Sequence, residues 1–375
     1  MVGNLLYCGD NLDVLKRYIQ DEAIDLVYLD PPFNTSATFD VLLTKHVGEG
    51  AGMQTRAFED TWRWDEAAVR AYEETVEKGG QVAQALWSFR GLLGPCNMMA
   101  YLAMMAIRLK ELRRVLKSTG SIYLHCDPTA SHYLKVLMDA VFGPGSFRNE
   151  IVWERTNVHN DARRKFPEVS DTIFFYTKGE QYTFHTQYAP YSDAYVSAFY
   201  RHVDKDGRRY TTRDLRSPHP RPNLTYEYKG YRPHPNGWSI SRERMEEFDA
   251  RGLLVFPRSK GGRIRLKRYL DEMPGVPVSS IWRDLKPIHA QATERLGYPT
   301  QKPEALLERI IRAGSNEGDT VLDPFCGCGT AMITAERLHR GWVGIDANSL
   351  AIELTERRLR NTFGDAVAYS CIPAR

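Results

Sequence analysis

The chain has 375 residues, of which 42% are hydrophobic and 26% charged, so a disordered chain is excluded and a large core or two domains can form. No apolar run approaches the ~20 residues of a membrane-spanning helix, and the first residues lack the positive charge of a signal peptide. Six scattered cysteines are too few for a disulfide scaffold, and these features together predict a cytoplasmic protein.

The formal net charge of +3 is unevenly distributed. Residues 201–270 contain 18 Lys and Arg against 8 Asp and Glu, a net charge of +10, so the remaining residues together carry −7. A basic segment in a neutral-to-acidic body favours contact with a polyanion. A solvated surface with a local excess of charge explains the same numbers, so both interpretations stay open.

The first part of the chain alternates short strands and helices. A strand at 5–7 precedes a helix at 11–20, and an apolar, β-branched strand follows at 24–29. This strand ends at Asp30, because Pro31 and Pro32 cannot continue it. Residues 34–60 show no clear period and contain three glycines, which predicts a mobile loop beside Asp30.

The alternation continues after this segment, breaks in the middle of the chain and then resumes. The expected elements are a helix at 98–117, a strand at 121–125, a helix at 129–142 and strands at 149–154 and 171–177. After the break, helices are expected at 303–313, 330–339 and 349–360, strands at 320–323 and 342–345, and a terminal strand or tail. The pattern predicts a mainly parallel α/β sheet assembled from both ends of the chain.

The middle segment is rich in Tyr, Arg, Pro and His and has little periodicity. We therefore expect three parts: a first catalytic part at 1–178, an inserted domain at 179–294 and a second catalytic part at 295–375. Insertion at a surface loop is tolerated when the ends of the loop lie close together. The aromatic residues Tyr226, Tyr228, Tyr231 and Trp238 fit the core of such a domain at least in part.

A glycine loop follows the strand at 320–323 and opens a helix. It contains Asp323, Phe325, Gly327, Gly329 and Thr330, and its two glycines allow the backbone to approach a ligand closely. Asp346 ends the next strand about 20 residues on, where nucleotide-binding folds place a carboxylate for ribose hydroxyls. Position 332 is methionine where dinucleotide loops have a third glycine, which disfavours NAD. A tight turn without a ligand remains the simpler alternative.

The run Asp30-Pro31-Pro32-Phe33 forms a compact pocket for a planar amine. The lone pair of an exocyclic amine is delocalised into its ring, so an acceptor for the amine protons restores its nucleophilicity. The Asp30 carboxylate and the Pro31 carbonyl can accept together, since Pro32 fixes the conformation of Pro31. Phe33 offers an aromatic ring on which the planar group that carries the amine can stack.

Together these two motifs resemble the amino-methyltransferases of DNA, and their order resembles the permuted beta class of that family. The resemblance implies a Rossmann-like sheet with circularly permuted motifs and S-adenosylmethionine (SAM) as cofactor. By this resemblance the glycine-loop residues named above wrap the methionine part, and Asp346 holds the ribose. Lys302 lies near the cofactor carboxylate, and the segment of Asp10 and Asn11 contacts the adenine. Asp10 fits a helix N-cap as well.

The resemblance further implies that the insert recognises double-stranded DNA and that the product is N6-methyladenine. N4-cytosine methylation is the first rival; RNA methylation, a catalytically silent DNA-binding subunit and an oxidoreductase are others. A homodimer and a cognate restriction endonuclease are possible partners, and no metal is expected, since Cys326 and Cys328 have poor spacing for zinc. The candidate DNA contacts are Arg208, Arg209, Arg213, Arg216, Arg263, Arg265, Lys267 and Arg268.

Overall fold

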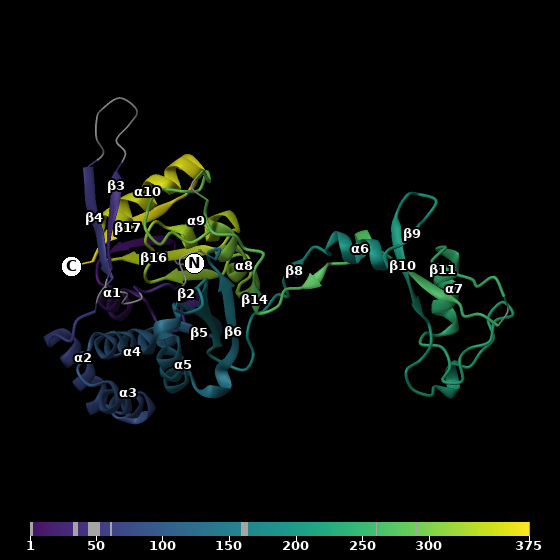
Figure 1. Ribbon diagram of the computed structural model, residues 1–375, viewed down its shortest axis with the longest axis horizontal. Helices are drawn as coiled ribbons and strands as arrows, with labels where there is room; N and C mark the ends of the chain where they lie inside the picture. Colours follow the sequence, from purple (N-terminus) through teal and green to yellow (C-terminus); the bar gives the residue numbers. More distant parts are fainter. Residues whose placement is uncertain are drawn as a thin grey trace. The chain divides into compact units, whose positions relative to one another are not determined.

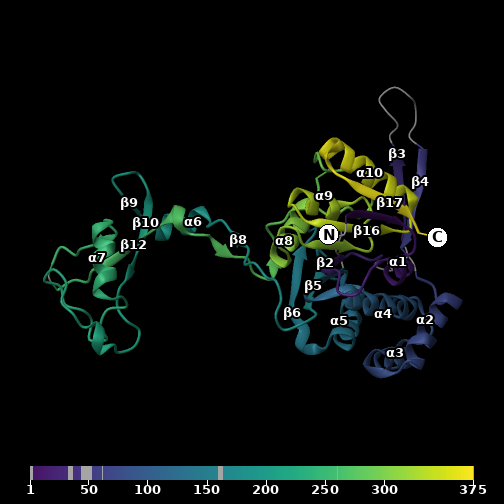
Figure 2. The ribbon, with the colours of Figure 1, turned by 180° about the vertical axis from the view of Figure 1, so that it is seen from behind.

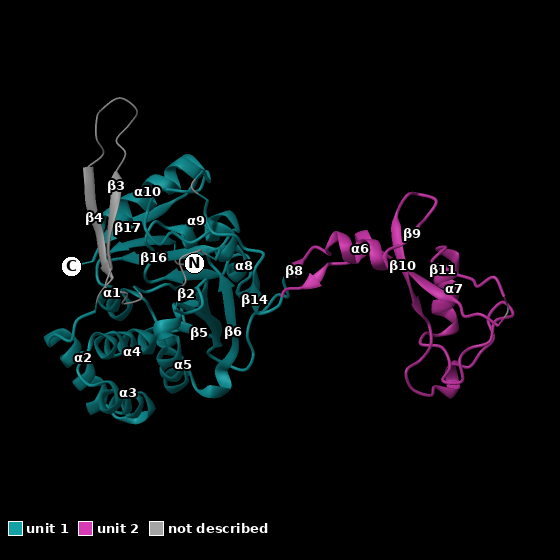
Figure 3. Ribbon diagram, viewed as in Figure 1, with its two compact units in different colours: residues 1–187, 279–375 teal, residues 188–278 magenta. Residues whose placement is uncertain are grey.

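A computed structural model describes residues 3–32, 37–43, 53–60, 62–158, 164–259, 261–289 and 291–374. The chain forms two compact units, residues 1–187 with 279–375, and residues 188–278 (Figure 3). The second unit is shorter than the insert expected at 179–294. Its flanks belong to the first unit, where the His185 amide donates to the Ala313 carbonyl (2.8 Å) and Ile281–Trp282 joins the large sheet.

Nine strands within the described residues form the sheet of the first unit, and all of them run parallel except β7. In spatial order they are β14 (Ile281–Trp282), β6 (Phe147–Glu154), β7 (Ser170–Thr177), β5 (Leu116–Cys126), β2 (Ile24–Leu29), β15 (Thr320–Asp323), β16 (Gly341–Asp346), β1 (Asn4–Cys8) and β17 (Tyr369–Pro373). The predicted Rossmann-like sheet with permuted chain order is confirmed: strands from both ends of the chain lie side by side.

Helices cover both faces of this sheet (Figures 1 and 2). One face carries α8 (Glu304–Gly314), α9 (Thr330–Arg337) and α10 (Ser349–Phe363), and the other carries α1 (Asn11–Tyr18), α4 (Asn97–Val115) and α5 (Pro128–Phe142). Their apolar stripes are buried; Leu109 and Leu112 of α4, for example, are fully inaccessible. Two further helices, α2 (Glu66–Glu77) and α3 (Gly80–Leu93), pack outside α4 and α5 and were not predicted.

Two local predictions were wrong. Within the loop expected at 34–60, the structure has antiparallel strands β3 (Ala37–Leu43) and β4 (Met53–Asp60), and a register shift between Phe39 and Asp40 interrupts the alternation that marks a strand. Helix α4 ends at Val115 rather than 117, because Leu116 already pairs with Ile24 in the sheet. Gly120 therefore lies in β5, where a Cβ atom would stand 2.9 Å from the Asp25 carbonyl.

The second unit is a small sheet and helix around its own core. Its strands β11 (Leu254–Val255), β12 (Arg265–Tyr269), β10 (Arg209–Asp214) and β9 (His202–Val203) pair in that order, and it also contains α6 (Asp193–Phe199) and α7 (Arg242–Ala250). Tyr228 and Trp238 are buried in this core, and Tyr226 and Tyr231 pack against it. Strands β8 (Tyr188–Ala189) and β13 (Val276–Pro277), at the two ends of the unit, pair antiparallel.

Candidate active site

Three aspartates stand at one edge of the large sheet. Strands β2, β15 and β16 are neighbours and run parallel, so their carboxyl ends lie together. Asp30 follows β2, Asp323 ends β15 and Asp346 ends β16. A cavity of about 600 Å³ opens at this edge, a size typical of small-molecule sites. Its walls include Asp10, Asn11, Asp30, Pro31, Pro32, Lys302, Asp323, Phe325, Gly327, Thr330 and Asp346.

Asp30 presents its two carboxylate oxygens differently. Oδ2 accepts a hydrogen bond from Nζ of Lys302, so this lysine, expected near the cofactor carboxylate, also pairs with the amine-pocket aspartate. Oδ1 is buried and has no hydrogen-bond partner among the described residues. A buried oxygen without a partner is costly, unless a ligand completes it. Phe33, the fourth residue of the motif, lies outside the described residues.

The glycine loop has the backbone that the sequence predicts. Gly329 caps α9 in the left-handed region (φ 77°), and a Cβ atom there would lie 2.5 Å from Cγ2 of Thr355. Gly327 also has positive φ (50°), and its amide donates to Oδ2 of Asp346 (2.9 Å). Gly329 is not among the residues that line the cavity; its missing side chain leaves room for Thr355 of α10. Tyr298, which the sequence did not single out, also lines the cavity, and its ring lies against Gly327, where a Cβ atom would stand 3.3 Å from Cε1.

The two aspartates beside the loop are held as acceptors. Oδ1 of Asp346 accepts from the Asn348 amide (2.8 Å), and Oδ1 of Asp323 accepts from the Phe325 amide (3.0 Å). Burial raises the pKa of Asp346 and raises that of Asp323 well above its ordinary value, although the backbone amides oppose the shift. A ligand that donates further hydrogen bonds to Asp346, beyond those of the Asn348 and Gly327 amides, would favour its anionic form.

Asp10 and Asn11 are tied to a buried arginine that the sequence did not reveal. Oδ1 of Asp10 caps α1 by accepting from the Leu12 amide (2.9 Å), which confirms the N-cap interpretation. Oδ2 of Asp10 accepts from Nη2 of Arg108 (2.7 Å), and Oδ1 of Asn11 accepts from its Nε (2.6 Å). The Asn11 amide donates to the Pro324 carbonyl (2.7 Å), so this corner also supports the glycine loop.

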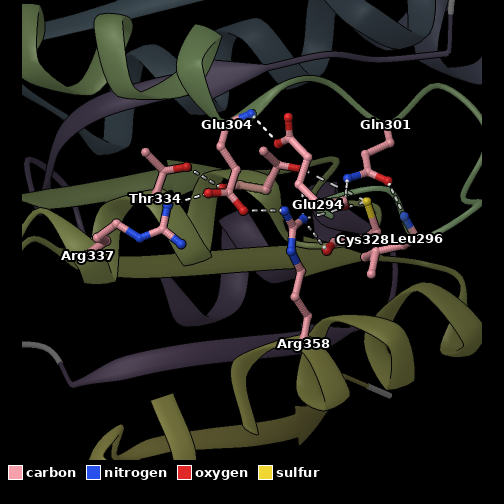
Figure 4. Close-up of polar contacts among 9 residues, drawn as sticks. Glu294, Leu296, Gln301, Glu304, Cys328, Thr334, Arg337 and Arg358 are labelled. Carbon is pink, nitrogen blue, oxygen red and sulfur yellow. Dashed lines mark hydrogen bonds and ion pairs between the residues drawn. The ribbon is translucent and has the colours of Figure 1, made fainter. Parts of the chain in front are cut away.

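A second buried arginine joins the glycine loop to the segment that carries Lys302 (Figure 4). Arg358 of α10 donates to the Cys328 carbonyl (3.2 Å), to Oγ1 of Thr330 (3.0 Å) and to Oε1 of Glu304 (2.8 Å). The Glu304 amide donates to Oε2 of Glu294 (2.9 Å). The Gln301 side chain accepts from the Leu296 amide and donates to the Glu294 carbonyl within the same segment. Arg358 thus holds together two segments that line the cavity, the glycine loop and the segment that carries Lys302.

Behind Asp30 lies a row of buried polar side chains from three strands. The Tyr28 hydroxyl and Nδ1 of His125 share a hydrogen bond (3.0 Å), and Nε2 of His125 lies 3.1 Å from Oδ2 of Asp171. Nε of Arg155 approaches the other Asp171 oxygen at 2.7 Å. His125 is inaccessible, and Asp171 and Tyr28 are each 2% exposed. The sequence placed His125 at a strand end but gave it no function.

The structure divides the eight candidate DNA contacts of the second unit. Three form ion pairs within the unit: Arg208 with Asp271 and Glu272, Arg263 with Asp214, and Lys267 with Asp204. Arg265 donates to Thr212 (2.7 Å). The other four side chains form no ion pair with a described residue and are exposed: Arg209, Arg213, Arg216 and Arg268.

Strand register explains this division. Thr211 opposes Arg268 and Arg213 opposes Leu266, so Arg209, Arg213 and Arg268 share one face of the β10–β12 pair. Lys267 and Arg265 lie on the other face, next to their partners. The arginines on the first face can therefore contact a polyanion without first breaking an ion pair to a described residue.

Cys326 and Cys328 belong to the glycine loop, are buried and contribute to the wall of the cavity. Across the described ranges, no three His, Cys, Asp or Glu side chains gather as a metal site would require. None of the helices described there is long and apolar enough to cross a membrane.

Comparison with known proteins identifies the family. The model of the DNA methylase family matches residues 24–357, nearly the whole chain. The chain belongs to the DNA methylase family. Among relatives of this DNA methylase is the type II methyltransferase M.EcaI of Enterobacter cloacae, 27% identical over 98% of this chain and 72% of its own length. Another is the StyLTI Mod subunit of a Salmonella typhimurium type III restriction-modification enzyme, 26% identical over 87% of this chain.

This DNA methylase spans about half of the Salmonella subunit, 49% of its length. The DNA adenine methyltransferase YhdJ of Escherichia coli is 24% identical over 94% of this chain and 81% of its own length. Among solved structures, a putative DNA modification methylase of Thermus thermophilus complexed with SAM covers 98% of this chain and 99% of its own, with 14% identity and a TM-score of 0.45.

Proposed function

We propose that this methylase transfers the methyl group of SAM to N6 of an adenine that is flipped out of double-stranded DNA. The observation that carries the proposal is Asp30, which lines the same cavity as the glycine loop and whose buried Oδ1 has no hydrogen-bond partner among the described residues. When bound, SAM supplies an electrophilic methyl group on its sulfonium. The residues present fit it: Asp346 offers an acceptor for ribose hydroxyls, and the loop backbone leaves room for the amino-acid part.

Asp30 supplies the acceptor that the amine needs. Lys302 holds Oδ2 and keeps the carboxylate oriented, so Oδ1 is the oxygen left to accept an amine proton. Accepting that proton localises the nitrogen lone pair and directs it toward the methyl group. The flipped base leaves its stack at a cost of a few kcal/mol, which contacts to the DNA backbone offset.

Adenine is favoured over cytosine by the aspartate at position 30, through the resemblance of its motif, and by the relative YhdJ, which is a DNA adenine methyltransferase. The proposal assigns DNA recognition to residues 188–278 and places the protein in the cytoplasm, where its DNA substrate is. A homodimer and a cognate restriction endonuclease remain part of the proposal; the Mod subunit among the relatives supports the endonuclease.

The test is to express the chain in a host without DNA methylation and to sequence its DNA with a method that detects modified bases. We expect N6-methyladenine in one sequence context. Detection of N4-methylcytosine instead would change the assigned target base and leave the proposed methyl transfer to an exocyclic amine unchanged. Unmodified DNA, together with SAM binding and DNA binding by the purified protein, would instead indicate a silent DNA-binding subunit.

A further inference from the structure

Four aromatic rings form a cluster around α6 of the second unit. The ring of Tyr195 stacks on that of Tyr191, with centroids 4.8 Å and planes 9° apart, and lies 4.6 Å from that of Phe199. The ring of Tyr200 contacts both tyrosines and is 4% exposed, whereas Phe199 is 56% and Tyr195 40% exposed. A spacing of four residues puts Tyr195 and Phe199 on one side of the helix, so a buried ring supports adjacent exposed rings.

The exposed rings are not needed for the core of the unit. That core is formed by other side chains, among them Tyr228 and Trp238. Large apolar side chains that stay exposed side by side are typical of a surface that binds a partner. We define the aromatic patch as Tyr191, Tyr195 and Phe199.

Two arginines without carboxylate partners border the aromatic patch. Arg201 directly follows Tyr200, and its Nε donates to the Ala198 carbonyl near the end of α6 (2.6 Å). Arg268 lies near the Tyr200 hydroxyl: burial raises the pKa of this hydroxyl, and the charge of Arg268 opposes the rise. Both arginines are exposed, and neither forms an ion pair with a described residue.

The patch also adjoins the cationic face of the β10–β12 pair. Strand β9 follows α6 in the chain, and its Val203 opposes Arg209, a member of that face. Of the two carboxylates nearest to the patch in the sequence, Asp204 is ion-paired with Lys267, and Asp193 lies in the first turn of α6. The end of the patch at the C-terminus of α6 therefore has a positive surrounding.

Exposed aromatic rings beside unpaired guanidinium groups fit unstacked nucleic-acid bases. A base offers a flat face to a ring, and the adjoining phosphate offers a negative charge to an arginine. A second copy of the chain fits less well, because a two-fold contact would bring the same cations against each other. Paired duplex DNA covers the faces of its bases by stacking, and flipping a base out uncovers them.

We propose that the aromatic patch stacks on DNA bases that have left the helical stack, while Arg201 and Arg268 contact the adjoining phosphates. No covalent bond forms or breaks in this interaction. The inference rests on the proposed function for its DNA partner, and it goes further by naming the feature of DNA that the patch binds. A single strand and a duplex with an unpaired base both offer that feature.

The test measures the affinity of the full-length protein for a labelled oligothymidine of about 20 nucleotides. Tyr195→Leu and Phe199→Leu keep an apolar side chain and remove the ring. Each should weaken binding by roughly tenfold, within the range for the loss of one stacked base. Tyr195→Phe keeps the ring and should bind within a few-fold of wild type. The matched control is Tyr188→Leu, the same change at an exposed tyrosine of β8 outside the patch, which should bind like wild type.

Salt dependence separates stacking from charge. Loss of a ring removes no phosphate contact, so the slope of log affinity against log salt should stay as in wild type for both Leu variants. The double change Arg201→Gln, Arg268→Gln should instead flatten the slope by about 0.7 per lost contact, the value for single strands. Wild type should also bind a duplex with one unpaired thymine more tightly than the fully paired duplex, and both Leu variants should lose this preference.

Melting temperatures show whether each variant is folded. Within the cluster, the ring of Phe199 contacts that of Tyr195 alone, so Phe199→Leu carries the test if Tyr195→Leu unfolds. Wild type that does not bind oligothymidine, Leu variants that bind it like wild type, or a loss of affinity accompanied by a flatter slope would overturn the inference. It is also overturned if the Leu variants bind DNA normally but self-associate less in sedimentation, because the patch then joins two copies.

The outcomes are distinct from those of the proposed function. Wild-type protein that binds oligothymidine through these rings but leaves no methyl group on DNA refutes the proposed function and leaves this surface in place. Active wild type whose Leu variants bind with unchanged affinity refutes only the role of the aromatic patch.

Discussion

The division of cations in the second unit gives a prediction about salt. Arg209, Arg213 and Arg268 form no ion pair with a described residue, whereas Arg208, Arg263 and Lys267 are ion-paired with carboxylates. Changing either set of three to Gln removes the same charge. We expect only the first change to remove phosphate contacts, because its members are exposed and share one face of the sheet.

The magnitude follows from counterion release. Each phosphate contact contributes about 0.9 to the slope of log affinity against log salt, so three lost contacts should flatten the slope by about 2.7. Between 50 and 200 mM salt, each contact changes the affinity by about 3.5-fold, so the triple variant should lose roughly 40-fold less affinity than wild type over that range.

The assay is fluorescence anisotropy with a labelled non-specific duplex at five or six salt concentrations. The set Arg208→Gln, Arg263→Gln, Lys267→Gln is the control, and we expect its slope to stay within about one contact of wild type. SAM affinity should be unchanged in both. Equal flattening in the two sets would show that the ion pairs do not decide which cations meet DNA, and no flattening in either would remove this sheet from the interface.

Three further predictions concern the cavity. Asp30→Ala should abolish methylation and leave SAM affinity within a few-fold by calorimetry; substantial turnover would refute the proposed role of Oδ1. Asp346→Ala should weaken SAM binding by roughly tenfold or more. In wild type, the raised pKa of Asp346 means that affinity should fall as the pH is lowered and the carboxylate protonates; a flat pH dependence would contradict this. Arg358→Met removes the hydrogen-bond donor to Glu304, Thr330 and the Cys328 carbonyl, and each group left without its partner costs about 1–3 kcal/mol of stability. Both the melting temperature and the SAM affinity should therefore fall. The control Arg357→Met, at an exposed position, should change neither.

The sequence predicted the parts of this molecule that local rules determine. Strand ends at Asp30 and Asp346 follow from apolar runs and prolines, and parallel neighbours must bring such ends to one edge. Gly329 was identifiable because its backbone conformation favours glycine. The approach of Lys302 to Asp30 was not predictable, since it joins residues 272 positions apart.

The missed residues share a cause. Arg108 and Arg358 lie on helices whose apolar neighbours signal only packing, and nothing local shows that their guanidinium groups reach inward to Asp10 and Glu304. His125 and Asp171 come from strands that are antiparallel neighbours, so their pairing depends on register rather than on spacing in the sequence. Counting charges identified the basic segment but could not show which cations share a face of the sheet, because this depends on the register between β10 and β12.

The second unit begins and ends in strands that pair with each other, Ala189 opposite Val276. Its entrance and exit are therefore neighbours, and a short turn could join them in its absence. If residues 188–278 recognise DNA as proposed, the reading of DNA sequence and the chemistry of methyl transfer can be exchanged as separate modules. A chimera that receives the corresponding segment of another family member at these two strands should keep its cofactor cavity and acquire a new target.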